Sequence, residues 1–222
     1  MQKFDTSAPI TTVLDIPAGR VQFIAADRAD TTVEIRPADA TKERDVKVAR
    51  QTEVQYGDGV LRIVATAKNQ AFGPSGSIEV TVQLPAGSRV EAKAASAEVR
   101  AVGRFGDVAV ESAHGSIKID EAESARLTVV AGDVSVGRLN GPAQISTGKG
   151  DISVTEAVRG TVVLRTEAGD VAVGAAAGVS ASLDAGTSYG RVHNALMNTE
   201  GPAAPLAIQA TTAYGDITAR SL

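Results

Sequence analysis

The sequence predicts an all-β fold, a two-sheet β-solenoid, on two observations. First, a short phrase recurs seven times between Ala97 and Ala219: a glycine (once alanine), any residue, a β-branched residue, any residue and usually an apolar one. Second, successive copies start 18, 17, 18, 19, 21 and 25 residues apart, and such a period is typical of chains that stack one β-unit on the next. The alternative is a pair of antiparallel β-sandwich domains. The copies are AEVRA from Ala97, GSIKI from Gly115, GDVSV from Gly132, GDISV from Gly150, GDVAV from Gly169, GRVHN from Gly190 and GDITA from Gly215.

The composition supports closely spaced sheets. Hydrophobic residues make up 43 % of the 222 residues, but aromatic residues only 3 %, and tryptophan is absent. Aromatic rings normally supply much of the buried area of a globular core. A core of Val, Ala, Ile and Leu is thin, and it fits two sheets that lie close together.

Each repeat is expected to form one rung of two strands. The residue two positions after the glycine is β-branched in all seven copies, and the next residue is mostly polar, so the strand that follows the glycine alternates between the core and solvent. A second strand precedes each glycine, with its inward candidates seven and five residues earlier. The inward residues after the glycine are Val99, Ile117, Val134, Ile152, Val171, Val192 and Ile217.

Glycine marks the corner between the two strands because it tolerates positive φ and a close approach of the backbone. The segment Ala195–Pro205 is the longest insertion between rungs and is predicted to be a surface loop.

The N-terminal part is expected to be an interrupted version of the same architecture, within one solenoid domain over residues 1–222. Residues 1–37 supply the first strands and a first rung, with residues 31–37 an earlier strand of the coil. Residues 38–77 form a β-hairpin insertion that caps the open end, and residues 78–222 form the regular rungs. The hairpin strands are residues 45–49 and 59–65 around an Asp-Gly turn at Tyr56–Gly59, and Phe72–Ser77 closes the insertion. No helix is expected.

The repeated GDVxV and GDIxV phrases, which follow LPAGSRVEA and SAEV, resemble the bacterial putative-adhesin family of unknown function with β-strand repeats (domain-of-unknown-function family 4097). The resemblance is strongest from Ile78 to Ala219. It implies a right-handed single-stranded β-helix or two-sheet solenoid, and it brings no catalytic motif.

One column of residues offers candidate chemistry. Directly after the corner glycines, Asp133, Asp151 and Asp170 follow one another at the rung period. Stacked rungs lie about 4.8 Å apart, so neighbouring carboxylates would repel by about 1 kcal/mol in water. A divalent cation would relieve that repulsion, which makes these three residues weak candidates for metal ligands. The favoured interpretation is that they are solvated turn residues, and we assign no metal, cofactor or catalytic residue.

A second feature is a candidate interaction surface. Tyr189 and Tyr214 both directly precede a corner glycine, in TSYG and TAYG, and are expected to stack in one column on the outside. Arg191 replaces aspartate in the neighbouring column. Exposed tyrosines either stabilise the last rungs as an aromatic ladder or contact a sugar or a protein.

The remaining features narrow the classes of function. With 22 basic and 26 acidic residues the chain has no basic stripe for nucleic acid, and it contains no cysteine. We expect no signal peptide and no membrane span, and hence a cytoplasmic location unless a precursor was processed. The leading hypothesis is a non-enzymatic scaffold or adhesin-like binding protein, with another protein or a glycan as its partner. The alternatives are a polysaccharide-processing β-helix enzyme that uses the acidic column and a self-assembling structural protein.

Overall fold

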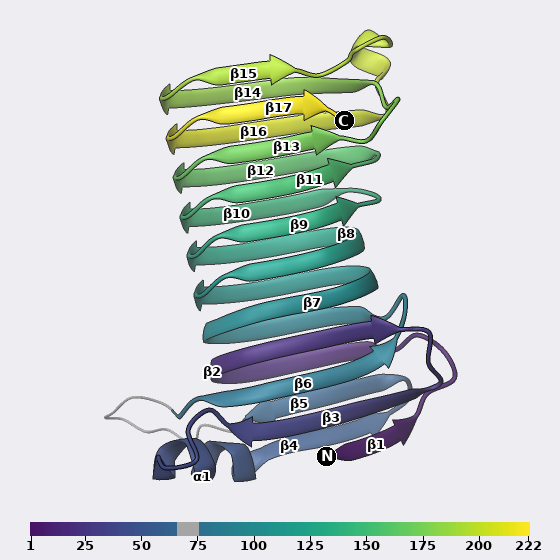
Figure 1. Cartoon of the computed structure of the whole chain (residues 1–222), viewed down its shortest axis with the longest axis vertical. Helices are drawn as coiled ribbons and strands as arrows, with labels where there is room; N and C mark the ends of the chain where they lie inside the picture. The colour runs from purple at the N-terminus through teal and green to yellow at the C-terminus, as the bar shows by residue number, and fades with distance from the viewer. Residues whose placement is uncertain (66–75) are drawn as a thin grey trace. The chain divides into compact units, whose positions relative to one another are not determined.

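The structure is a computed structural model that describes residues 1–65 and 76–222. It consists of two compact units, residues 1–115 and 116–222 (Figure 1). Both are built almost entirely of β-strands, as the repeat predicts. The closing segment expected at Phe72–Ser77 lies mostly outside the described residues.

Unit 1 is organised around two long strands that each bend at a corner and so contribute to two sheets. The first half of β2 (Thr11–Ala26) lies between β5 (Val60–Ala65) and β7 (Arg89–His114), and its second half lies between β6 (Ile78–Pro85) and β7. All these pairings are parallel. Within the β2–β7 pair, Thr11 pairs with Arg89, so these two neighbouring strands are 78 residues apart in the sequence.

Antiparallel strands cover the outer side of this coil. β4 (Thr52–Gly57) pairs with β5, and β3 (Asp30–Pro37) pairs with β6 and with β1 (Gln2–Asp5). Residues 31–37 are therefore not a level of the parallel coil, which corrects the expectation for them. The Asp-Gly turn is present, with Asp58 and Gly59 both at positive φ.

One helix, α1 (Glu43–Gln51), replaces the first predicted hairpin strand, so both that strand and the expected absence of helices were wrong. The alternation in DVKVA suggested a strand, but the segment ERDVKVARQ consists mainly of good helix formers. Acidic residues lie in its first turn and Arg50 in its last, where they suit the helix dipole. The buried Asp45 Oδ1 accepts the backbone N–H of Ser77 at 2.9 Å and fastens the helix to the start of β6.

Unit 2 is a regular two-sheet solenoid of parallel strands (Figure 1). The first sheet, which holds the strands that follow the glycine corners, contains the first half of β8 together with β9, β11, β13, β17 and β15. The second sheet contains the second half of β8 with β10, β12, β16 and β14. The strands are β8 (Ile117–Ala131), β9 (Val134–Leu139), β10 (Ala143–Lys149), β11 (Ile152–Ala157), β12 (Gly160–Ala168), β13 (Val171–Ala175), β14 (Ala181–Tyr189), β15 (Val192–Ala195), β16 (Leu206–Tyr214) and β17 (Ile217–Ser221).

The core of unit 2 is the predicted inward column. The β-branched residues two positions after the glycines are at most 1 % exposed from Ile117 to Val171 and again at Ile217. Val192, in β15, is 45 % exposed. In unit 2 the inward residue is therefore buried at every rung except that of β15.

The last two rungs are stacked in the reverse of their order in the sequence. β16 and β17 pair with β12 and β13 on one side and with β14 and β15 on the other, so the C-terminal rung is inserted between two rungs that precede it (Figure 1). The segment 196–205, with the short 3-10 helix η1 (Gly201–Ala203), makes the connection. β14 and β15 therefore form the terminal rung of unit 2.

Candidate functional site

The aspartates after the corner glycines form a hydrogen-bonded ladder. Each carboxylate Oδ1 accepts the backbone N–H of the equivalent residue on the next rung: Asp133 from Asp151 at 2.9 Å, Asp151 from Asp170 at 2.8 Å, and Asp170 from Asp216 at 2.7 Å. Charge-assisted bonds of this kind are stronger than neutral ones. They supply an acceptor for a backbone donor at each turn, where the strand pairing is interrupted.

Arg191 ends this ladder. Its backbone N–H donates to Asp216 Oδ1 at 2.8 Å and its guanidinium Nη2 donates to Asp216 Oδ2 at 3.0 Å. These two bonds hold the pKa of the Asp216 carboxyl below its usual value, with the backbone bond as the largest cause. An arginine side chain has no acceptor, so it cannot receive the N–H of a further rung. The residue that breaks the aspartate pattern is therefore at the last rung of the stack.

A threonine lies three residues before the glycine at four of these corners, those of Gly150, Gly169, Gly215 and Gly190. Its hydroxyl donates to the carbonyl of the corner glycine on the preceding rung, at 3.0–3.1 Å. The threonine is visible in the sequence, in the segments TGKG, TEAG, TAYG and TSYG, but it was not among the predicted site residues. The donors are Thr147, Thr166, Thr212 and Thr187.

The glycines are required because the rungs meet too closely for a side chain. A Cβ on Gly169 would lie 2.1 Å from the carbonyl oxygen of Gly150, and a Cβ on Gly215 would lie 2.0 Å from that of Gly169. Both residues also have φ of +151°. Close approach and positive φ thus both select glycine at this corner.

This geometry gives the acidic column a structural role. One oxygen of each carboxylate already accepts a backbone N–H, and Asp133, Asp151 and Asp170 are exposed rather than gathered in a cavity. Within residues 1–65 and 76–222, no group of three His, Asp or Glu side chains is arranged to hold a metal ion. The predicted stacking of the column is present, but with Asp216 as its fourth carboxylate and Arg191 at its end.

Tyr189 and Tyr214 lie side by side at the same corner. Their rings are stacked with centroids 5.0 Å apart and planes inclined by 3°, and the residues are 68 % and 61 % exposed. Although 25 residues separate them in sequence, β14 and β16 pair in register and place them opposite each other. The structure thus brings together all three residues of the predicted interaction surface, because Arg191 follows Tyr189 by two residues. We call Tyr189, Tyr214 and Arg191 the terminal corner.

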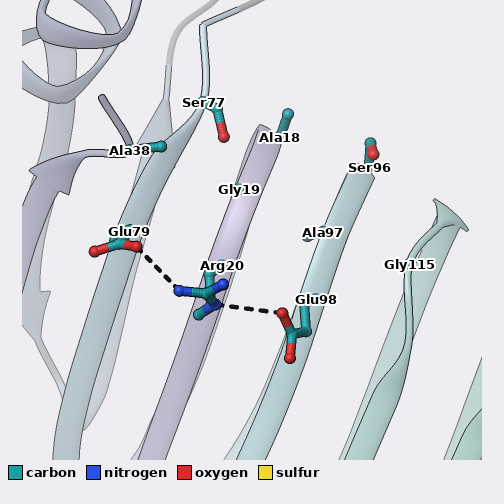
Figure 2. A pocket seen from close by; sticks show the side chains of 10 residues that line it. All are labelled: Ala18, Gly19, Arg20, Ala38, Ser77, Glu79, Ser96, Ala97, Glu98 and Gly115. Atoms are coloured by element: carbon teal, nitrogen blue, oxygen red, sulfur yellow. Dashed lines mark hydrogen bonds and ion pairs between the residues drawn. The ribbon is translucent and has the colours of Figure 1, made fainter. Parts of the chain in front are cut away.

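Unit 1 carries a different arrangement at its corner. A hollow of about 320 Å³ lies where Arg20 extends between two carboxylates, with Nη1 3.2 Å from Glu79 Oε1 and Nε 3.3 Å from Glu98 Oε2 (Figure 2). All three side chains are largely exposed, so these ion pairs contribute little to stability. Since the guanidinium is shared by two anions, it is not a free anion site. The other lining residues are Ala18, Gly19, Ala38, Ser77, Ser96, Ala97 and Gly115.

The stacked parallel rungs and the glycine corners define a β-solenoid of the class found in repeat proteins. The sequence model of the Toastrack DUF4097 family matches residues 13–221, and the chain belongs to that family. Among the residues that the structure describes, no helix has the length and apolar character of a membrane span.

Three solved structures are similar to the chain, at identities that are informative about the fold alone. They are a putative lipid binding protein from Parabacteroides distasonis (10 % identity, TM-score 0.50, covering 98 % of this chain and 95 % of that one), a putative adhesin from Bacteroides fragilis (10 %, 0.48, 98 % and 95 %) and a putative adhesin from Parabacteroides distasonis (13 %, 0.44, 100 % and 95 %). A search of the curated proteins finds no match to this chain.

Proposed function

We propose that this Toastrack-family chain is a non-enzymatic, adhesin-like binding module and that the terminal corner is its contact surface. One observation carries the proposal: two tyrosine rings are stacked and more than half exposed, at a corner where the arginine two residues after Tyr189 has a side chain that is 89 % exposed. Tyrosine and arginine, together with tryptophan, are enriched among the residues that dominate binding energy at interfaces. At the aspartate corners of unit 2, by contrast, the carboxylates of Asp133, Asp151 and Asp170 already accept a backbone N–H of the neighbouring rung.

The proposal is tested by binding and turnover on one panel of glycans and candidate partner proteins. Glycan arrays and biolayer interferometry with the purified chain are expected to find a ligand that is lost in a Tyr189→Ala/Tyr214→Ala/Arg191→Ala variant. The matched control is Lys118→Ala/Arg126→Ala, which removes exposed side chains on β8. Equal binding by the two variants would contradict the location of the site, and release of product from the bound glycans would contradict the non-enzymatic role.

Self-association is the second candidate, and a separate observation favours it. In the described part of the chain, β14 pairs with β16 alone and β15 with β17 alone, so no strand pairs with the outer edge of the terminal rung. Only the start of β14 is covered, where the Ala181 N–H donates to the Met197 carbonyl at 3.0 Å. Unpaired strand edges can accept another strand. Sedimentation velocity across a hundredfold range of concentration tests this candidate: a growing dimer fraction supports it, and a constant monomer rejects it.

A further inference from the structure

The ring of Tyr189 offers one free aromatic face. Its other face is covered by Tyr214, at 5.0 Å between centroids, and β14 is the outermost strand of its sheet in unit 2. No further rung therefore covers the outer face, and the residue is 68 % exposed. Because Tyr214 fixes the plane of the ring, this face is a preorganised platform that a ligand can use at little entropic cost.

The same corner carries an exposed cation, Arg191, two residues after Tyr189. The guanidinium of Arg191 is anchored through one nitrogen, since Nη2 donates to Asp216 Oδ2 at 3.0 Å, while the side chain remains 89 % exposed. An arginine has five N–H donors in a planar fork, so donors remain for an incoming carboxylate. His193, also exposed, follows by two residues on β15.

The surroundings favour a small ligand over another rung. Arg191 provides no carboxylate to accept the backbone N–H of a following rung, as each aspartate does. The segment around η1 also rises beyond β14 and β15 at the end of the rung opposite the turn between these strands (Figure 1). The platform at that turn remains open, and its size is that of a single ring.

We propose that the terminal corner binds an acidic saccharide, with the apolar face of one sugar ring on Tyr189 and the ring carboxylate on Arg191. A uronic acid combines the two required features in one residue, a flat C–H face and an anion at its rim. Its hydroxyl groups remain in water at so exposed a site, so little desolvation opposes binding. This inference rests on the proposed function and specifies its ligand class.

Tyrosine ring NMR tests the inference directly, because the chain has three tyrosines and no tryptophan. Tyr56 packs against Phe4 in unit 1 and serves as the internal reference. In the full chain with ring-labelled tyrosine, a galacturonic acid oligomer is expected to shift the Tyr189 signals most and to leave those of Tyr56 unchanged. The neutral galactose oligomer should bind at least about tenfold more weakly, the equivalent of about 1.4 kcal/mol.

Two pairs of variants separate the two contacts. Tyr189→Phe should retain binding because the ring remains, whereas Tyr189→Ala should weaken it about tenfold or more. Arg191→Gln should abolish the preference for the acidic over the neutral oligomer, whereas Arg191→Lys keeps part of it, since lysine is a cation without the fork.

The outcomes are distinct. No shift of Tyr189 at millimolar oligogalacturonate, or equal shifts with polyglutamate, which has no sugar ring, would overturn the inference. If these sugars fail while another ligand binds the wild type and not the corner variant, the proposed function stands and the ligand class is wrong. If oligogalacturonate binds without moving the Tyr189 signals, the location of the site is wrong.

Discussion

Asp216 holds Arg191 through both carboxylate oxygens, with Oδ1 on its backbone N–H at 2.8 Å and Oδ2 on its guanidinium at 3.0 Å. The residue later in the sequence thus supports the earlier one, because the C-terminal rung is inserted beneath the rung of β14 and β15. An aspartate offers a carboxylate to the backbone N–H of a following rung, whereas an arginine side chain offers no acceptor. The identity of these two residues therefore fits the reversed order of the rungs.

The glycine corner is expected to be intolerant of a methyl group. Gly169→Ala places a Cβ 2.1 Å from the Gly150 carbonyl oxygen at a φ of +151°, and we expect a loss of about 2–4 kcal/mol in the free energy of unfolding. Gly186→Ala is the matched control, since its Cβ meets nothing within 4 Å. Urea denaturation followed by circular dichroism measures both. Equal losses in the two variants would show that the close approach is not what selects glycine.

We expect the stability of the aspartate ladder to depend on an acceptor more than on charge, because the charge assistance of each bond is offset by repulsion between the stacked carboxylates. Asp170→Ala removes the acceptor for the Asp216 backbone N–H, and we expect a loss of about 1 kcal/mol. Asp170→Asn keeps an oxygen and removes one of the stacked charges, so its stability should equal or exceed that of the wild type. Glu167→Ala, an exposed carboxylate on the same β12, is the control. Thermal denaturation in low and high salt compares them, and a destabilised Asn variant would contradict this account.

The buried threonine hydroxyl contributes through its hydrogen bond. Thr212 is 5 % exposed and its Oγ1 donates to the Gly169 carbonyl at 3.0 Å. Thr212→Val keeps the shape of the side chain and leaves that carbonyl without this donor, which should cost about 1 kcal/mol. Thr211→Val, on the exposed side of the same strand, should have a far smaller effect. Urea midpoints measure both variants. A lower midpoint for Thr212→Val alone supports the hydrogen bond, whereas equal midpoints would show that the shape of the side chain is sufficient.

Protonation of Asp216 is expected to weaken the terminal rung. The backbone and side-chain bonds from Arg191 lower the pKa of Asp216 in the folded state below its usual value. A carboxyl with a depressed folded pKa stabilises the fold above its unfolded pKa, and this contribution disappears as the pH falls through the folded pKa. Carboxyl NMR titration should find the pKa of Asp216 below the usual value of an aspartate, and Arg191→Ala should raise it part of the way by removing the guanidinium bond. Because alanine keeps the backbone N–H, which is the larger cause, the pKa should remain below its usual value in that variant, and an unchanged pKa would contradict the contribution of the guanidinium.

The local pattern was enough to predict much of the fold. A glycine followed by alternating apolar residues at a regular period specifies strands, corners and an inward column, because strand geometry alternates strictly and a corner needs a residue without Cβ. Ile152 and Val171 are core residues, and Gly150 and Gly169 are corners, as predicted. The same alternation misled at residues 45–49, where a short amphipathic pattern fits a helix equally well.

The sequence by itself determined the two-sheet rungs, the glycine corners and the stacked column that contains Asp133, Asp151 and Asp170. Only the tertiary structure decided which rung is last, since every rung offers the same backbone edge and sequence order does not select among them. That choice places Tyr189 on Tyr214 and Arg191 on Asp216, from residues 25 positions apart in the chain. The terminal corner is therefore a product of long-range strand pairing, which no local pattern encodes.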